Sequence, residues 1–168
     1  SYEKAHALID TAADAGADAV KFQWVYADEI LHPETGTVNL PTGQIRLYDR
    51  FKSLECGADF YADMLKYAHS RGILFGCSPF GLKSLSELLE IKPDFVKIAS
   101  PELNHYPMLK ALARFRENQK ARKENAVPVI ISSGVSRLSD IEKALEILGT
   151  DGVTLLHCIT SYPAPEDE

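Results

Sequence analysis

The sequence predicts an α/β fold built from parallel strands, and three observations lead to this fold class. Apolar, strand-prone segments alternate with amphipathic helical segments along the whole chain. No hairpin signal joins one of these strands to the next, which is typical of parallel βα units. Polar side chains recur in or directly after every strand, and a barrel gathers such strand ends around one mouth. We therefore predict a parallel (β/α)8 TIM barrel, present here as a partial barrel of about strands 2–6.

The first helix and the first strand introduce the pattern. Residues 2–15 carry small and aliphatic side chains at helical spacing, and Gly16 is expected to end that helix. Residues 17–24 follow as a strand. Because alternate side chains of a strand point to the same face, Lys21 and Gln23 should share one face of it.

A long connection, residues 25–57, follows this strand and is rich in Pro, Gly and Thr. Its central part, residues 32–43, is expected to form turns and a small hairpin. A connection of this length inside a compact domain is usually functional or mobile.

The rest of the chain repeats the alternation of helix and strand. We expect helices at residues 58–71, 82–91, 108–123 and 139–148, and strands at residues 73–77, 95–100, 127–132 and 153–158. One of these helices has a basic second half, which we interpret as a solvated helix end rather than a binding patch. The basic residues are Arg114, Arg116, Lys120, Arg122 and Lys123.

Composition excludes several classes of partner. The 168 residues suffice for one domain, and the formal net charge of −6 argues against a nucleic-acid surface but not against a local cationic pocket. No apolar run approaches the roughly 20 residues of a membrane span.

Three cysteines without metal-type spacing indicate reduced thiols, and we expect a cytoplasmic protein. The chain begins at Ser1 rather than at Met, which is compatible with a removed leader.

A lysine inside a strand is the most informative single feature. Lys97 lies in the middle of strand 95–100, where an unpaired ammonium is costly to bury. With Lys21 it would supply two cations to one mouth, together with three strand-end hydroxyls, Ser78, Ser100 and Ser132. Such a set suits a phosphate, with or without a carboxylate. The alternative is that Lys97 reaches water from an edge strand and that the serines cap helices.

Glu102 follows the same strand and would act as a general base or orient a sugar hydroxyl, unless it only neutralises Lys97. No two histidines have metal-ligand spacing, so the residues themselves predict no metal site. His157 lies in the last predicted strand, where a hydrogen-bonded core histidine is an equally good interpretation.

These stretches together resemble the sialic acid (N-acetylneuraminate) synthase family, the phosphoenolpyruvate-condensing nonulosonate synthases. The motifs that carry the resemblance are Gly-Ala-Asp-Ala-Val-Lys-Phe-Gln at 16–23, Cys-Ser-Pro-Phe at 77–80, Phe-Val-Lys-Ile-Ala-Ser at 95–100 with Glu102 and Asn-His-Tyr-Pro at 104–107, Pro-Val-Ile-Ile-Ser-Ser-Gly at 128–134, and Leu-His-Cys-Ile-Thr-Ser-Tyr-Pro-Ala-Pro at 156–165. They cover nearly the whole chain, in order and on the predicted strands.

The resemblance implies a TIM-barrel transferase that condenses phosphoenolpyruvate with an N-acyl hexosamine such as N-acetylmannosamine. Carbon C3 of the enolpyruvate would attack the open-chain aldehyde, and water at C2 would release phosphate by C–O cleavage. A divalent metal, Mn²⁺ or Mg²⁺, would polarise the aldehyde and orient the water.

Carried over motif by motif, the resemblance divides the site into two groups of residues. Phosphoenolpyruvate would be held by Lys21, Ser78, Lys97, Ser100 and Ser132, whereas the sugar and the reacting carbons would face Gln23, Glu102 and Tyr162. The family's first strand would precede Ser1. Its metal-binding histidines, its last strands and its C-terminal antifreeze-like domain would follow Glu168. We therefore expect residues 1–168 to be a partial TIM-barrel catalytic domain, inactive alone and homodimeric in the full-length protein.

Two departures from the family pattern bear on the kind of member. Thr160 stands where many members carry asparagine, a departure that bears on sugar or phosphate specificity. Residues 40–54 differ from the usual loop, and this difference favours a spore-coat-polysaccharide-type member. Two other functions stay open. One is another TIM-barrel aldolase acting on a phosphorylated metabolite, with Lys97 forming a Schiff base, and the other is a non-catalytic sugar-phosphate-binding barrel.

Overall fold

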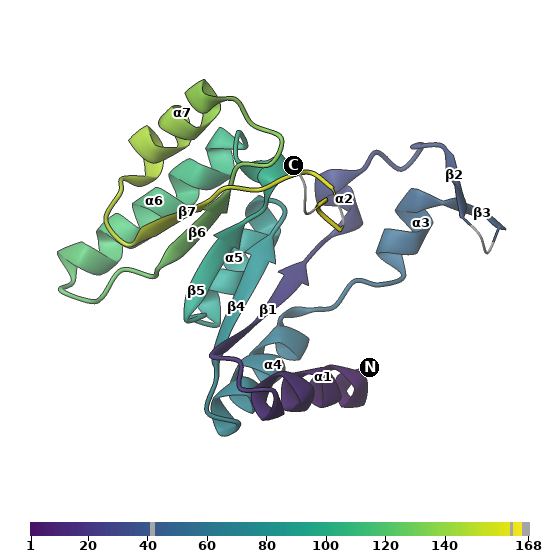
Figure 1. Cartoon of the computed structure of the whole chain (residues 1–168), viewed down its shortest axis with the longest axis horizontal. Helices are drawn as coiled ribbons and strands as arrows, with labels where there is room; N and C mark the ends of the chain where they lie inside the picture. The colour runs from purple at the N-terminus through teal and green to yellow at the C-terminus, as the bar shows by residue number, and fades with distance from the viewer. Residues whose placement is uncertain (41–42, 162, 166–168) are drawn as a thin grey trace. The chain divides into compact units, whose positions relative to one another are not determined.

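The computed structural model describes residues 1–40, 43–161 and 163–165, and the chain divides into two compact units, Ser1–Asp94 and Phe95–Glu168. Each unit combines parallel strands with helices that follow them in the chain, as Figure 1 shows by its labels. None of the helices among these residues is long and apolar enough to cross a membrane.

The first unit contains two parallel strands, β1 and β4, whose register runs from Ala19 opposite Leu74 to Trp24 opposite Pro79. Its elements are α1 (Tyr2–Asp14), β1 (Ala19–Trp24), α2 (Ala27–Ile30), β2 (Thr37–Leu40), β3 (Gly43–Arg46), α3 (Leu47–Lys52), α4 (Ala58–Ser70), β4 (Leu74–Pro79) and α5 (Leu82–Glu90). Figure 1 shows α1 and α4 lying side by side.

Aromatic packing decides which face of β1 is covered. Phe22 makes an edge contact with Phe60 of α4, and Trp24 stacks on Tyr61 of the same helix with ring centroids 3.9 Å apart. Because successive side chains of a strand alternate, the side chains between these aromatic residues belong to the opposite face. That face carries the polar residues of β1.

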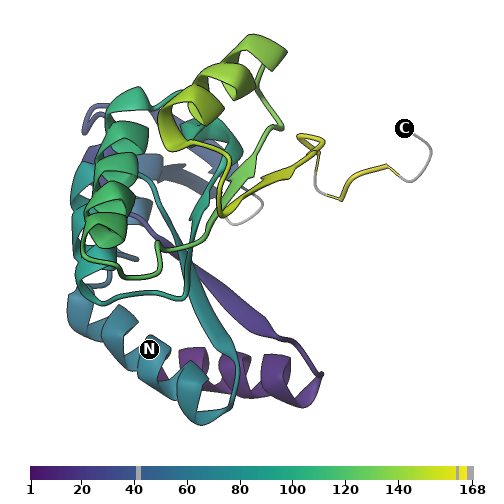
Figure 2. The ribbon, with the colours of Figure 1, turned by 90° about the vertical axis from the view of Figure 1, so that its left-hand side faces the viewer.

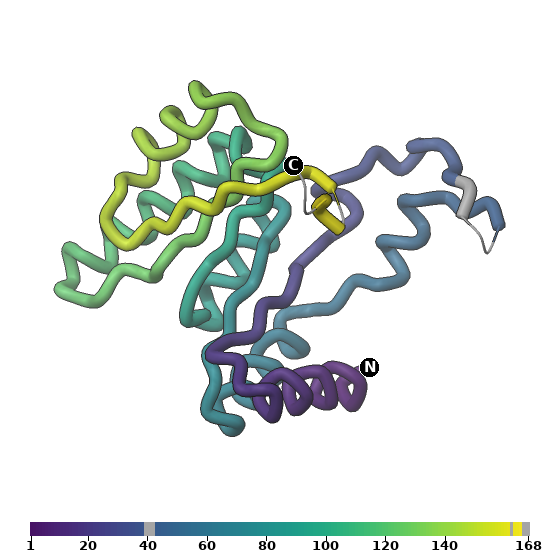
Figure 3. Tube along the Cα trace, in the orientation of Figure 1, coloured from purple at the N-terminus to yellow at the C-terminus, as the bar shows by residue number. Residues whose placement is uncertain are grey.

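The long connection after β1 is more ordered than the sequence indicates. It contains a hairpin in which β2 pairs antiparallel with β3, and β3 extends beyond the residues 32–43 where the hairpin was predicted. It also contains two short helices, α2 and α3, that were not predicted. Asp28 of α2 links these helices, since it pairs with Lys52 at 2.8 Å and accepts a hydrogen bond from the Tyr48 hydroxyl. Figure 3 follows this connection as it leaves β1 and returns at α4.

The second unit contains three parallel strands in the order β5, β6, β7. Its elements are β5 (Phe95–Ile98), the 3₁₀ turn η1 (Ser100–Glu102), α6 (Tyr106–Ala121), β6 (Val129–Ser132), α7 (Leu138–Leu148) and β7 (Val153–Leu156). Helices α6 and α7 lie together on one side of these strands (Figure 2). The strands predicted at 127–132 and 153–158 are thus shorter than expected.

One residue of the predicted solvated helix end is buried, so that prediction is wrong at Arg116. Its side chain is 3% exposed, whereas Arg114 and Lys120 on the same helix are exposed. The Arg116 guanidinium donates to the backbone carbonyls of Val127 and Leu148, each at 3.0 Å, and to that of Asp151. It therefore joins α6 to the start of β6 and to the end of α7.

Candidate functional site

In the first unit, Lys21, Gln23 and Ser78 lie on one face of the β1–β4 pair. Ser78 is the register partner of Gln23, and Lys21 lies opposite Gly76. Register partners on neighbouring strands are about 4.8 Å apart and point to the same face. Lys21 and Gln23 are exposed, so the polar face of β1 is open to a ligand.

Two of the predicted serines are buried with unsatisfied hydroxyls. Ser78, near the end of β4, is 1% exposed, and Ser132, the last residue of β6, is 2% exposed. Neither Oγ atom has a hydrogen-bond partner among the described residues. Leaving a buried hydroxyl unsatisfied costs about 1–3 kcal/mol. Both hydroxyls are therefore suited to bind a polar ligand atom.

In the second unit, Lys97 and Ser132 belong to the same face of the strands. Lys97 is opposite Ile130 in the register of β5 and β6, and Ser132 follows Ile130 by two positions on β6. The neighbours of Lys97 on β5, Val96 and Ile98, are fully buried and belong to the other face. Lys97 itself is half-buried.

The segments that follow β5, β6 and β7 meet around the backbone of Gly134. The Gly134 N–H donates to Ser100 Oγ at 3.0 Å, and the Thr160 hydroxyl donates to the Gly134 carbonyl. A Cβ atom on Gly134 would lie 3.0 Å from both of these hydroxyl oxygens, so this close approach favours glycine. The bond that Ser100 accepts leaves its own O–H available to donate.

Glu102 ends the η1 turn and pairs with His105, the residue directly before α6. Its Oε2 atom lies 3.2 Å from His105 Nδ1, and its side chain is 15% exposed. Imidazole contact and partial burial hold the carboxylate in one orientation, as a base or a sugar-binding group requires.

Three remaining predictions concern the last strand and a metal. Tyr162 lies outside the described residues. His157 follows β7 and is exposed, so its predicted place inside a strand is wrong. Across residues 1–40, 43–161 and 163–165, no group of three or more His, Cys, Asp or Glu side chains is arranged to hold a metal ion. The described residues therefore do not fit the divalent metal that the family resemblance implies.

Glu29 has a positioning role that the sequence did not reveal. Helix α5 begins after Gly81, which has no side chain to cap it, and the Glu29 carboxylate takes that place by accepting from Lys83 N at 2.6 Å and Ser84 N at 3.1 Å. This contact fixes the turn that follows Ser78. The missing cap at Gly81 was the only signal in the sequence.

Comparisons with known proteins relate the chain to one enzyme family. A model of the NeuB family matches residues 8–168. The spore coat polysaccharide biosynthesis protein SpsE of Bacillus subtilis is 32% identical over 98% of this chain. The N,N'-diacetyllegionaminic acid synthase of Campylobacter jejuni is 33% identical over 96% of it. The chain spans 43% and 48% of the lengths of these two relatives, respectively.

A solved structure shows the same arrangement of strands and helices. The N-acetylneuraminic acid (sialic acid) synthetase of Leptospira borgpetersenii, solved in complex with citrate, superimposes with a TM-score of 0.81 at 29% identity, over 99% of this chain and 52% of that one. The predicted fold class is confirmed, since the structural neighbours are TIM-barrel synthases and this chain has the parallel βα units of a partial barrel.

Proposed function

Because the chain belongs to the NeuB family, we propose that it is part of a nonulosonate synthase that condenses phosphoenolpyruvate with an N-acyl hexosamine and releases phosphate. Relatives named as synthases of acetylated nonulosonates support an enzyme of carbohydrate biosynthesis. The observation that carries the proposal is that the hydroxyls of Ser78 and Ser132 are buried and unsatisfied, each on a strand face of its own unit that also carries a lysine.

We assign the phosphoenolpyruvate-binding role to Lys21, Ser78, Lys97, Ser100 and Ser132. The two ammonium groups balance the charge of the phosphate and the carboxylate, while the hydroxyls supply directional hydrogen bonds. Barrel enzymes place such groups at the carboxyl ends of their strands. Ser78 and Ser132 lie at the ends of β4 and β6, and Ser100 comes directly after β5. Lys21 and Lys97 lie inside β1 and β5.

Gln23, Glu102 and Tyr162 are proposed to face the acceptor sugar and the reacting carbons. The C2–C3 π electron pair of the enolpyruvate forms a bond between C3 and the aldehyde carbon. Water adds at C2 and supplies two protons: one goes to the former aldehyde oxygen, and the other leaves with the phosphate when the C2–O bond breaks. Glu102 is the proposed base that accepts the first of these protons from water and passes it to the former aldehyde oxygen.

Several finer features stay predictions beside this proposal. They are a divalent Mn²⁺ or Mg²⁺ ion with ligands outside the described residues, a homodimer of the full-length protein and a cytoplasmic location. No step above depends on the metal. Residues 1–168 alone are predicted to be inactive, and Mn²⁺-dependent phosphate release from phosphoenolpyruvate by this segment would contradict that.

The serine hydroxyls offer the most direct test of substrate binding. With the intact gene product, N-acetylmannosamine and Mn²⁺, we expect Ser78→Ala and Ser132→Ala each to raise the KM for phosphoenolpyruvate about tenfold or more, because a hydrogen bond to a charged group contributes about 1.5–3 kcal/mol. Phosphate release measures the effect. Ser139→Ala, at an exposed serine of α7, is the matched control. An unchanged KM in both site variants would contradict the proposed role.

A further inference from the structure

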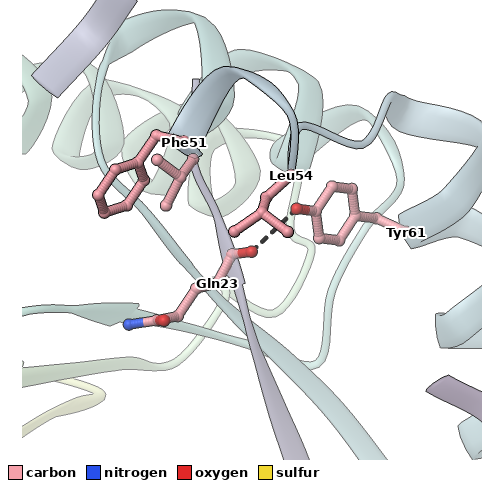
Figure 4. A pocket seen from close by; sticks show the side chains of 5 residues that line it. Gln23, Phe51, Leu54 and Tyr61 are labelled. Carbon is pink, nitrogen blue, oxygen red and sulfur yellow. Dashed lines mark hydrogen bonds between the residues drawn. The ribbon is translucent and has the colours of Figure 1, made fainter. Parts of the chain in front are cut away.

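A hydroxyl group has one proton to donate, and the atom that accepts this proton decides what the residue can do. In the first unit, the Tyr61 hydroxyl donates to the backbone carbonyl of Gln23 at 2.9 Å, and Figure 4 shows the Gln23 side-chain amide pointing away from this contact. A hydroxyl of this kind fixes the backbone that it holds and has no proton left for an anionic ligand.

Thr160, which follows β7 in the second unit, has its hydroxyl committed in the same way. The Thr160 hydroxyl donates to the backbone carbonyl of Gly134. A phosphate dianion has only acceptor oxygens, so each residue that binds it must supply a donor. Thr160 therefore cannot donate to a phosphate while it holds Gly134. Ser100 keeps its own proton, because Ser100 Oγ accepts a hydrogen bond from the Gly134 N–H at 3.0 Å.

The two residues that follow β6, Ser133 and Gly134, are held from both sides. On the side of β7, the backbone N–H and the hydroxyl of Ser133 both donate to the Leu156 carbonyl, at 3.2 and 3.0 Å, and Thr160 holds Gly134. On the side of β5, the Gly134 N–H contacts Ser100. A change at Thr160 can therefore reach Ser100 through Gly134.

Packing leaves Gly134 little room between these contacts. A Cβ atom added to Gly134 would lie 3.0 Å from both Ser100 Oγ and Thr160 Oγ1, and 3.4 Å from Cys158 Cβ. The two hydroxyls thus approach the same side of Gly134. Without the Thr160 contact, the Gly134 carbonyl loses its donor and the segment can turn away from Ser100, whose hydroxyl is then free to rotate.

We infer that Thr160 is a positioning residue for phosphoenolpyruvate binding. By holding the Gly134 carbonyl, it keeps the Gly134 N–H on Ser100 Oγ and so directs the Ser100 hydroxyl proton toward the phosphate. Ser100 contacts the ligand, whereas Thr160 acts through Gly134 and does not. This inference rests on the proposed function and adds to it a residue outside direct contact with the substrate.

Binding of phosphoenolpyruvate gives the first test. The intact gene product is titrated calorimetrically with phosphoenolpyruvate, and KM and kcat are measured by phosphate release with N-acetylmannosamine and Mn²⁺. We expect Thr160→Val to weaken binding and raise the KM about three- to tenfold, the equivalent of one net hydrogen bond, with kcat changed less than about twofold. Thr160→Ser should retain the original values, because it keeps the hydroxyl. Thr150→Val, at an exposed threonine between α7 and β7, is the matched control. An unchanged affinity in Thr160→Val would overturn the inference.

A double-mutant cycle separates positioning from direct contact. In a Ser100→Ala background, Thr160→Val should weaken phosphoenolpyruvate binding by less than about twofold, since the hydroxyl that Thr160 positions is gone. Effects of the two substitutions that multiply would show that Thr160 contacts the ligand itself, and the positioning role would then be wrong.

Amide hydrogen exchange at Gly134 tests the same contacts without any substrate. We expect the Gly134 amide to exchange at least about tenfold faster in Thr160→Val and at an unchanged rate in Thr150→Val, because only the first change releases Gly134. Unchanged exchange in Thr160→Val would overturn the inference. Faster exchange, in a protein that neither binds phosphoenolpyruvate nor releases phosphate, would support the positioning of Ser100 by Thr160 while refuting the proposed function.

Discussion

At the scale of single residues, Arg116 has a structural role that its sequence neighbours conceal. Burial lowers the pKa of its guanidinium, and three carbonyl oxygens compensate the buried donors. The residue sits in a run of surface cations, so the charge pattern predicts a solvated side chain. The acceptors are the carbonyls of Val127, which precedes β6, of Leu148, which ends α7, and of Asp151, which follows α7. These contacts, 11 to 35 positions away in the sequence, explain why the Arg116 side chain is buried.

We predict that Arg116→Met lowers the free energy of unfolding by about 2–4 kcal/mol, because the methionine fills the space but leaves three carbonyls without donors. Urea unfolding followed by circular dichroism measures this loss. Arg114→Met, an exposed position on the same helix, should change stability by less than about 0.5 kcal/mol. Equal effects of the two substitutions would show that the carbonyl contacts contribute nothing specific.

Some features of the candidate site could be predicted from the sequence, and others could not. Ser78 and Ser132 are predictable because each stands where an apolar strand ends, and their burial follows from that place. The contacts of Ser100 and Thr160 with Gly134 were not predictable, because they join residues 34 and 26 positions apart through backbone groups. Long-range hydrogen bonds of this kind leave no periodic signal.

At the scale of elements, α2 is attached to α5 by a set of polar contacts. The Tyr26 hydroxyl donates to Glu87, and Lys83 lies 4.0 Å above the Tyr26 ring. Burial, together with the hydrogen bond to Glu87, raises the pKa of Tyr26 to about 12. With the Glu29 cap, these contacts hold the segment after β1 against the helix that follows β4.

Gly81 is the position where this attachment is most sensitive. A Cβ atom there would collide with the Glu29 side chain. We predict that Gly81→Ala, as a single substitution, lowers the free energy of unfolding by about 1–3 kcal/mol, because the Glu29 side chain must leave the N-terminus of α5. In a Glu29→Ala background the same substitution should cost less than about 0.5 kcal/mol.

Chemical denaturation of the four proteins in this double-mutant cycle gives the coupling. Gly36→Ala serves as the control, since nothing lies within 4 Å of its added Cβ atom. Additive effects of Gly81→Ala and Glu29→Ala would refute the role of Glu29 as the cap of α5.

The elements that the sequence predicted are those with long periodic patterns. Helices α1, α4, α5, α6 and α7 begin or end within about two residues of their predicted bounds, because apolar spacing and glycine stops define them. Helices α2 and α3 were missed because they have four and six residues, too few for a periodic signal. Tertiary contacts, such as Asp28 with Lys52, stabilise them instead.

At the scale of the whole molecule, an acidic protein is proposed to bind a strongly anionic substrate. The net charge of −6 opposes general attraction of anions, so binding must come from a local set of lysines and hydroxyls. The order of parallel βα units was predictable from the alternation of strand and helix, and the likeness to the Leptospira synthetase confirms that fold class.

The fate of the bridging oxygen of phosphoenolpyruvate tests the proposed reaction most directly. Phosphoenolpyruvate labelled with oxygen-18 between C2 and phosphorus is incubated with the intact gene product, N-acetylmannosamine and Mn²⁺, and the released phosphate is analysed by mass spectrometry. We expect phosphate release that requires the amino sugar, with the label in the phosphate, because the C2–O bond breaks. Label retained in the organic product, or phosphate released equally without the sugar, would contradict a phosphoenolpyruvate-condensing synthase.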